Sequence, residues 1–203
     1  MKRLILASNN KKKIKEMKEI LRDLDVEVKS LENENINIDV VEDGKTFEEN
    51  AKKKASEIYE FLLERGDKNF IVLADDSGLV VEYLHGEPGI YSARYAGEHG
   101  NDEKNNEKLL NNLKGVDKKN RDAKFICQLA MITDTGEYFK VTGDVKGYII
   151  EAAYGEKGFG YDPLFLYEEL NKTFAQLTPN EKNKISHRGV ALKKLKKIIS
   201  SVL

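Results

Sequence analysis

Hydrophobic positions fall into short runs and helical spacings that alternate along the chain. An apolar run over residues 3–8 is typical of a buried strand. The apolar residues that follow recur every three or four positions, which predicts a helix: Ile14, Met17, Ile20, Leu21 and Leu24. A second helix is expected from the capping box at Thr46 to Gly66. A strand followed by helices predicts an α/β protein.

Turn-forming residues divide the rest of the chain. Residues 70–74 are expected to form a second apolar strand that ends in a turn at 75–78, and residues 79–84 a strand that returns from it. Residues 123–133 and 138–150 are β-like, and the turn between them predicts a hairpin. The remaining segments are expected to be a glycine-rich loop over 85–100, a polar helix over 101–113, a glycine-rich stretch over 155–160, a helix capped by Thr178 and a last helix over 190–202.

Composition narrows the class of protein. The 203 residues are 40% hydrophobic, which suits one domain over 1–203, with two lobes as a variant. A net charge of −1 offers no basic stripe for nucleic acid and no general attraction to an anionic membrane. The N-terminal apolar run is too short for a signal peptide or a membrane span. The single cysteine, Cys127, lies in an apolar run and is expected in the core. We therefore expect a cytoplasmic protein that binds neither nucleic acid nor membrane.

A polar junction separates the first strand from the first helix: Ser8, Asn9, Asn10, Lys11, Lys12 and Lys13. Backbone N–H groups at the start of a helix have no intrahelical acceptor, so such a junction can hold a phosphate. Asparagine tolerates a positive φ, and a lysine one turn into the helix reaches the same anion. An ordinary capped helix with a solvated lysine face has the same pattern, so the junction alone does not establish a site.

Two adjacent carboxylates, Asp75 and Asp76, follow an apolar strand. Open α/β sheets present ligands at the carboxyl ends of strands, and Mg²⁺ prefers one or two carboxylates with phosphate oxygens and waters. The next residue, Ser77, allows close approach of a substrate. A turn without function has the same composition. Glu42 is of interest only as a second metal ligand, and one or two of Lys52–Lys54 can face a cleft.

Aromatic and cationic residues toward the C-terminus point to a nucleobase site. Glycines on both sides of Phe159 leave its ring accessible for stacking, and Asp162 can accept hydrogen bonds from ring N–H groups. His187 and Arg188 can donate to the 6-keto oxygen of a purine. A structural loop followed by a helix that Ser186 caps would explain the same residues without a ligand.

Taken together, these segments resemble the inosine triphosphate pyrophosphatase family, which hydrolyses ITP, dITP and XTP. The resemblance runs in order from Ser8 to Gly189, and six segments carry it: residues 8–13, 46–51, 74–79, 86–94, 158–163 and 185–189. It implies an elongated mixed β-sheet flanked by helices, with two lobes and a central cleft, in a homodimer. It also implies a Mg²⁺-dependent enzyme that cleanses the nucleotide pool by converting these purine triphosphates to monophosphates and pyrophosphate.

The resemblance assigns roles to individual residues. Glu42 and Asp76 would hold Mg²⁺, and Asp76 would be the catalytic base, although the residues alone leave open whether Asp75 or Asp76 is the base. Beyond the resemblance, we hypothesise that Lys13 and Lys54 neutralise negative charge on the departing pyrophosphate. The substrate-binding residues would be Ser8, Asn9, Asn10, Lys11, Lys12, Lys13, Lys54, Ser77, Phe159, Gly160, Tyr161, Asp162, Lys182, His187 and Arg188. The family often opens its first segment with Thr-Gly-Asn, which differs from the Ser-Asn-Asn found here.

Two rival functions fit parts of the pattern. A Maf-like pyrophosphatase would prefer pyrimidine or methylated triphosphates, and the segment around His187 with Phe159 favours purines instead. A nucleotide sensor would bind without hydrolysis, and the acidic residues argue against it, because a pure binder gains little from anions that face a triphosphate.

Overall fold

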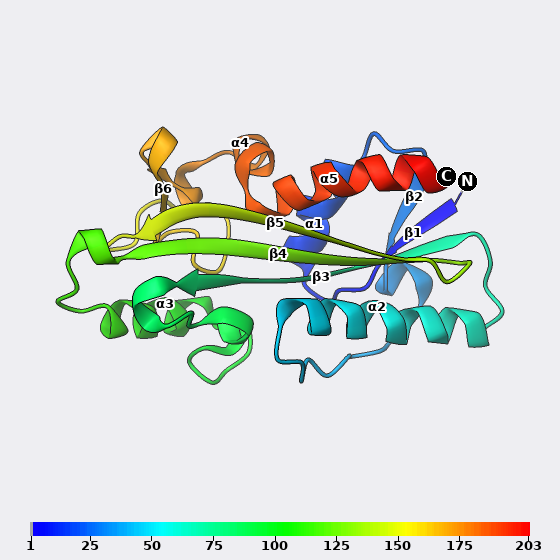
Figure 1. The fold of residues 1–203 in the computed structure, drawn as a ribbon, viewed down its shortest axis with the longest axis horizontal. Coiled ribbons are helices and arrows are strands. Elements are labelled where there is room, and N and C mark those ends of the chain that lie inside the picture. The colour runs from blue at the N-terminus through cyan, green and yellow to red at the C-terminus, as the bar shows by residue number, and fades with distance from the viewer. Residues whose placement is uncertain (1) are drawn as a thin grey trace. The chain divides into compact units, whose positions relative to one another are not determined.

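A mixed β-sheet organises the fold (Figure 1), and the computed structural model describes residues 2–203. Its strands follow the order β2-β1-β3-β4-β5-β6-β7, with β1 parallel to β2 and β3, and β6 antiparallel to β5 and β7. The strands are β1 (Lys2–Leu6), β2 (Val26–Ser30), β3 (Phe70–Val81), β4 (Asp122–Thr133), β5 (Tyr138–Ile149), β6 (Phe165–Tyr167) and β7 (Lys172–Thr173). The α-helices are α1 (Lys11–Leu21), α2 (Phe47–Glu64), α3 (Asp102–Asn112), α4 (Pro179–Ile185) and α5 (His187–Val202). The predicted mixed sheet with flanking helices is confirmed.

The chain forms two compact units. The first contains the described residues up to Asp76 together with Cys127–Gly143 and Arg188–Leu203. The second contains Ser77–Ile126 and Asp144–His187. These units correspond to the two predicted lobes, and the cleft expected between them stays a prediction.

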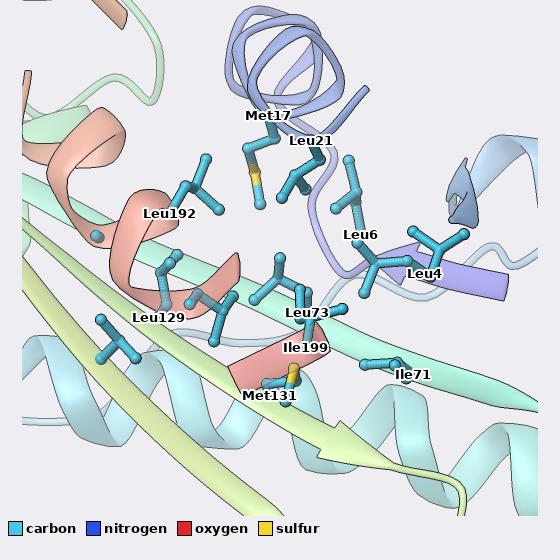
Figure 2. Packing of buried hydrophobic residues seen from close by; sticks show 14 of the residues in the cluster. Leu4, Leu6, Met17, Leu21, Ile71, Leu73, Leu129, Met131, Leu192 and Ile199 are labelled. Atoms are coloured by element: carbon cyan, nitrogen blue, oxygen red, sulfur yellow. The ribbon is translucent and has the colours of Figure 1, made fainter. Parts of the chain in front are cut away.

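The first unit has a core on each face of its strands. Side chains alternate along a strand, so Ile71 and Leu73 of β3 join a cluster with α1 and α5, whereas Val72 and Ala74 join a cluster with α2. Figure 2 shows the first cluster, in which Met17 and Leu21 of α1 and Leu192 and Ile199 of α5 meet leucines of β1, β3 and β4 and Met131 of β4. Figure 1 shows α1 and α5 on the opposite side of β3 from α2. The helices of this unit therefore form layers on both faces of the sheet.

The second unit has its own aromatic core. The Phe125 ring of β4 lies 4.7 Å from that of Phe165 and 5.8 Å from that of Phe174, centroid to centroid. Leu109 of α3 and Leu164 are buried in the same cluster. This packing supports the loop that follows β5.

Several predicted elements agree with the structure. The hairpin between β4 and β5 is present, and Thr46 caps α2 through a hydrogen bond from Glu49 N. Thr178 and Glu181 form a capping box at α4. Cys127 is fully buried, as expected. Among residues 2–203, none of the helices is both long and apolar enough to cross a lipid bilayer.

The predicted turn at 75–78 is wrong, because β3 continues from Phe70 to Val81 without reversal. Aspartate, serine and glycine are typical of turns when they are solvated, but here the two carboxylates are buried and have cationic partners from distant segments. The last helix begins at His187 rather than residue 190. The strands β2, β6 and β7 were not predicted, since three of the five residues of β2 are polar and β6 and β7 have only three and two residues.

Candidate active site

Strand β3 places its two aspartates on opposite faces of the sheet. Asp75 lies on the same face as Leu73, which packs against α1 and α5. Asp76 lies on the same face as Ala74, which packs against α2. Strand β1 ends at Leu6, opposite Leu73, so both aspartates lie just beyond the carboxyl end of β1. The strand end predicted for these carboxylates is therefore that of β1 and not of β3.

Donors surround the fully buried Asp75 carboxylate. Its Oδ1 accepts a hydrogen bond from Lys13 Nζ at 2.6 Å, and its Oδ2 accepts from Arg188 Nε at 2.9 Å and from Cys127 Sγ at 3.1 Å. Arg188 Nη1 donates to Glu16 Oε2 at 2.5 Å. Burial alone would raise the pKa of Asp75, but the guanidinium of Arg188 and the ammonium of Lys13 hold it well below its usual value. The two cations therefore favour the ionised form of Asp75.

Asp76 lies against α2 with a second carboxylate. Lys54 Nζ is 3.1 Å from Glu42 Oε1 and 3.5 Å from Asp76 Oδ1, so both carboxylates converge on one cation. Asn50 Nδ2 donates to Asp76 Oδ2 at 3.2 Å, and Asn50 Oδ1 accepts from Gly44 N at 2.8 Å. The buried amide therefore orients Asp76 and ties it to the loop that carries Glu42.

The two converging carboxylates differ in acidity. Burial raises the pKa of Asp76 to about 6; the Glu42 carboxylate adds to this rise, and the Lys54 and Lys13 ammonium groups oppose it. Burial would also raise the pKa of Glu42, but Lys54 outweighs it and leaves that pKa below its usual value. A base whose pKa lies near the working pH is well matched to accepting a proton from water.

The donor set of this cluster fits Mg²⁺. Two carboxylates meeting at one positive charge supply hard oxygen ligands, and Mg²⁺ commonly takes one or two carboxylates and completes its shell with phosphate oxygens and waters. Within residues 2–203, no group of three or more histidine, cysteine or acidic side chains is arranged to hold a metal. An ion bound by Glu42 and Asp76 would therefore depend on substrate and water for its remaining ligands.

The polar junction before α1 is capped from within. Asn10 Oδ1 accepts hydrogen bonds from Lys12 N at 3.0 Å and Lys13 N at 3.1 Å, so those two backbone donors already have an acceptor. The φ of Asn10 is −79°, and Asn9 also lies outside the left-handed region, so the positive φ allowed for in the sequence is not used. Ser8 Oγ accepts from Asn10 N at 3.2 Å. Three backbone N–H groups of the junction therefore already have side-chain acceptors within it.

Asp162 organises the predicted nucleobase residues of the second unit. Its Oδ2 accepts from Lys182 Nζ at 2.5 Å and from Phe159 N at 2.8 Å. The Lys182 ammonium lies 4.6 Å from the centroid of the Phe159 ring, over its face. His187 stacks on Phe125 with centroids 4.8 Å apart. The structure therefore brings Phe159, Asp162 and Lys182 together, with Asp162 and Lys182 almost entirely buried.

Helix α3 holds the loop that carries Phe159. Asp102 Oδ2 accepts from Gly160 N at 2.9 Å, and Asn106 Nδ2 donates to the Gly160 carbonyl at 3.0 Å. Tyr161 is buried and donates its hydroxyl to the Ser92 carbonyl at 2.8 Å. Tyr161 is therefore anchored in the core, whereas Phe159 remains partly exposed.

The other predicted residues take varied positions. Lys11 and Lys12 are exposed on α1, and Asn9 Nδ2 donates weakly to the Ile38 carbonyl at 3.4 Å. Ser77 is half-buried on β3. Arg188, predicted to reach a purine, belongs to the first unit and bonds Asp75 and Glu16.

Sequence reasoning missed several residues that support the site. They are Glu16, Asn50, Asp102, Asn106 and Phe125. A signal existed for Asn50: it falls on the apolar stripe of α2 beside Ala51, and a polar side chain on such a stripe is buried and must find partners. Lys54 lies on the same stripe, four residues on.

Comparison with known proteins identifies close relatives. The sequence model of the Ham1 family matches residues 4–198. The chain is 59% identical over 203 residues to a dITP/XTP pyrophosphatase of Clostridium perfringens and 49% identical over 203 residues to one of Clostridium tetani. These alignments cover all of this chain and 100% and 98% of the relatives. The solved structure of the Staphylococcus aureus Ham1 protein is 44% identical, with a TM-score of 0.86 over 100% of both chains.

Proposed function

We propose, because the chain belongs to the Ham1 family, that it hydrolyses purine nucleoside triphosphates such as dITP, ITP and XTP to the monophosphate and pyrophosphate. The observation that carries the chemistry is the convergence of Glu42 and Asp76 on the Lys54 ammonium. Two carboxylates and a buried cation suit a metal-bound triphosphate. They do not suit a simple anion-binding pocket, which would exclude carboxylates.

Glu42 and Asp76 are the residues that would hold Mg²⁺. The ion, when bound, supplies positive charge that neutralises triphosphate oxygens during phosphoryl transfer. Lys54 provides part of that charge already, since its ammonium lies between the same two carboxylates. Lys54 and Lys13 would stabilise negative charge on the departing pyrophosphate.

Asp76, rather than Asp75, is the proposed base. Asp75 is enclosed by Lys13, Arg188 and Cys127, and its pKa is held well below the usual range, so it has little tendency to take a proton. Asp76 has a pKa raised to about 6 by burial and is oriented by Asn50. It would orient or deprotonate a water for attack at the α-phosphorus.

The second unit would supply purine recognition. The Phe159 ring, flanked by Lys182, is suited to stacking, and Asp162 fixes both groups. His187 would donate to the 6-keto oxygen, which adenine lacks. A site that depends on such hydrogen bonds can reject a mismatched base by about 10⁴-fold. The junction at Ser8–Lys13 and the hydroxyl of Ser77 would contact the phosphates and sugar.

The remaining properties implied by the resemblance are also proposals. We propose a homodimer in the cytoplasm that acts on free nucleotides and not on nucleic acid. Light scattering coupled to size exclusion would give the mass of the particle, to be compared with 23.1 kDa for one chain.

Pyrophosphate release from a panel of triphosphates tests the function. ITP and XTP should turn over only with Mg²⁺ present, and dTTP and UTP should turn over at least about a hundredfold more slowly. Faster cleavage of dTTP or UTP would favour a Maf-like enzyme instead. Tight binding of ITP without any pyrophosphate release would favour a sensor.

A further inference from the structure

Four charged side chains form a continuous buried chain in the first unit. Lys13 bonds Asp75, Asp75 bonds Arg188, and Arg188 bonds Glu16. The Asp75 side chain is 0% exposed and that of Arg188 is 1% exposed, whereas Glu16 reaches the edge of the cluster at 15%. The two cations and two anions balance in charge. This balance matters because a buried charge is costly unless a partner compensates it.

The chain of ion pairs begins and ends on the same helix. Lys13 and Glu16 lie three residues apart on α1, so they project from one face of its first turns. Asp75 comes from β3 and Arg188 from the first turn of α5. The network therefore ties the start of α1, directly after the phosphate junction, to a strand and to a helix from the other end of the sequence.

Arg188 is suited to this bridging position by its shape. It donates from Nε to Asp75 and from Nη1 to Glu16, two nitrogens of one planar group that reach two separate carboxylates. A lysine ammonium at that position has a single nitrogen and cannot span both in the same way. The resemblance assigns Arg188 to the nucleobase, but both of these hydrogen bonds serve the neighbourhood of Lys13.

We propose that Glu16, Arg188 and Asp75 are positioning residues that hold the Lys13 ammonium in place for the triphosphate. Lysine side chains lose much rotamer freedom when fixed, and Arg188, together with Cys127, holds the other oxygen of the Asp75 carboxylate that fixes Lys13. The proposal rests on the proposed function, since it takes Lys13 as the group that meets the departing pyrophosphate. The proposal predicts that replacing Arg188 lowers activity by the same factor whichever nucleobase the substrate carries.

Glu16→Gln is the mildest probe of this network, because Glu16 lies at its partly exposed end. Its matched control is Glu19→Gln on the same helix, where Glu19 pairs with exposed Arg22. The expected result for Glu16→Gln is a fall in kcat of about tenfold, since a misplacement of about 1 Å can cost up to about a hundredfold. The fall should be equal, within about twofold, for ITP, XTP and GTP, and Glu19→Gln should match wild type.

A double-mutant cycle shows whether the residues act as one unit. Arg188→Lys and Glu16→Gln should be strongly non-additive, with the double variant close to Arg188→Lys alone, because either change breaks the same chain. Additive losses would overturn the proposal. A loss of activity that differs about tenfold or more between ITP and GTP would also overturn the proposal, since Arg188 would then act on the nucleobase.

A labelling experiment tests the positioning of the Lys13 ammonium without measuring catalysis. Acetylation of lysines by acetic anhydride, read by mass spectrometry, should modify Lys13 slowly in wild type and several-fold faster in Glu16→Gln. Lys11 and Lys12 are exposed on the same helix and serve as internal controls. Unchanged labelling of Lys13 would refute the proposal even if a variant loses activity by poor folding. Failure of wild type to hydrolyse ITP would reject the proposed function alone, because the labelling result would still stand.

Discussion

Replacement of Lys182 with methionine should destabilise the second unit strongly. The Lys182 and Asp162 side chains are 5% and 3% exposed, and their charged atoms lie 2.5 Å apart. Methionine fills similar space but leaves the Asp162 carboxylate without its cation. Removing one partner of a buried pair costs about 3–5 kcal/mol, and loss of the cation over the Phe159 ring adds about 0.5–2 kcal/mol.

Urea unfolding at constant pH measures this loss, with an unchanged slope showing that the folded state keeps its compactness. For a chain of this size, about 1 kcal/mol corresponds to about 2–4 °C in Tm, so the combined loss should lower Tm by about 7–28 °C. Lys184→Met changes an exposed lysine of the same helix and should have little effect.

The double variant Lys182→Met, Asp162→Asn gives the decisive comparison. An asparagine amide oxygen can still accept from Phe159 N but carries no buried charge. The double variant should therefore recover a large part of the stability lost by Lys182→Met alone. A loss below about 1 kcal/mol in the single variant, the size typical of a surface pair, would refute the reasoning, as would a double variant less stable than the single.

Three further predictions concern the metal cluster and the loop. Asp76→Asn keeps the shape but removes charge and base, so kcat for ITP should fall by about a hundredfold or more; a rate within threefold of wild type would reject the role. Because the folded pKa of Asp76 is raised to about 6, metal-free protein should lose stability as pH rises through that value, and Mg²⁺ should raise Tm more at pH 7.5 than at pH 5; equal shifts in a thermal-unfolding assay would contradict this. Gly158→Ala should raise KM for ITP, since a Cβ there would lie 2.0 Å from Asp162 Oδ2, whereas Gly160→Ala meets open space at a similarly positive φ and should change KM less.

Local sequence patterns predicted the long elements well. The threonine side chains that cap α2 and α4, Thr46 and Thr178, bond to the first turn of their own helix. Each capping interaction is therefore contained in four consecutive residues. The turn in the β4–β5 hairpin is local in the same way. The continuity of β3 through Asp75 and Asp76 could not be predicted locally, because it depends on cations 62 and 113 residues away that make burial of the carboxylates tolerable.

The sequence predicted which residues belong to the candidate site better than it predicted how those residues are arranged. Residue types marked Glu42 and Asp76 as acidic ligands, but not their convergence on Lys54. Once β3 is known to continue, the alternation of side chains places Asp75 and Asp76 on opposite faces of the sheet. The correct length of β3 would therefore have been enough to distinguish the proposed catalytic base from its neighbour. The contacts of Arg188 with Asp75 and Glu16 depend on tertiary packing, and no local sequence pattern predicted them.

The last helix completes a core begun by the first strand, and this has a consequence for biosynthesis. Helix α5 contributes Leu192, Leu195 and Ile199 to the cluster that contains Leu4 and Leu6. Its Arg188 also balances a carboxylate translated 113 residues earlier. A nascent chain that has emerged only as far as β5 therefore carries an incomplete apolar layer and a buried carboxylate that has Lys13 but still lacks Arg188. The first unit can reach its native state only after α5 has been translated, and truncation before this helix should yield an aggregation-prone product rather than a slightly shortened enzyme.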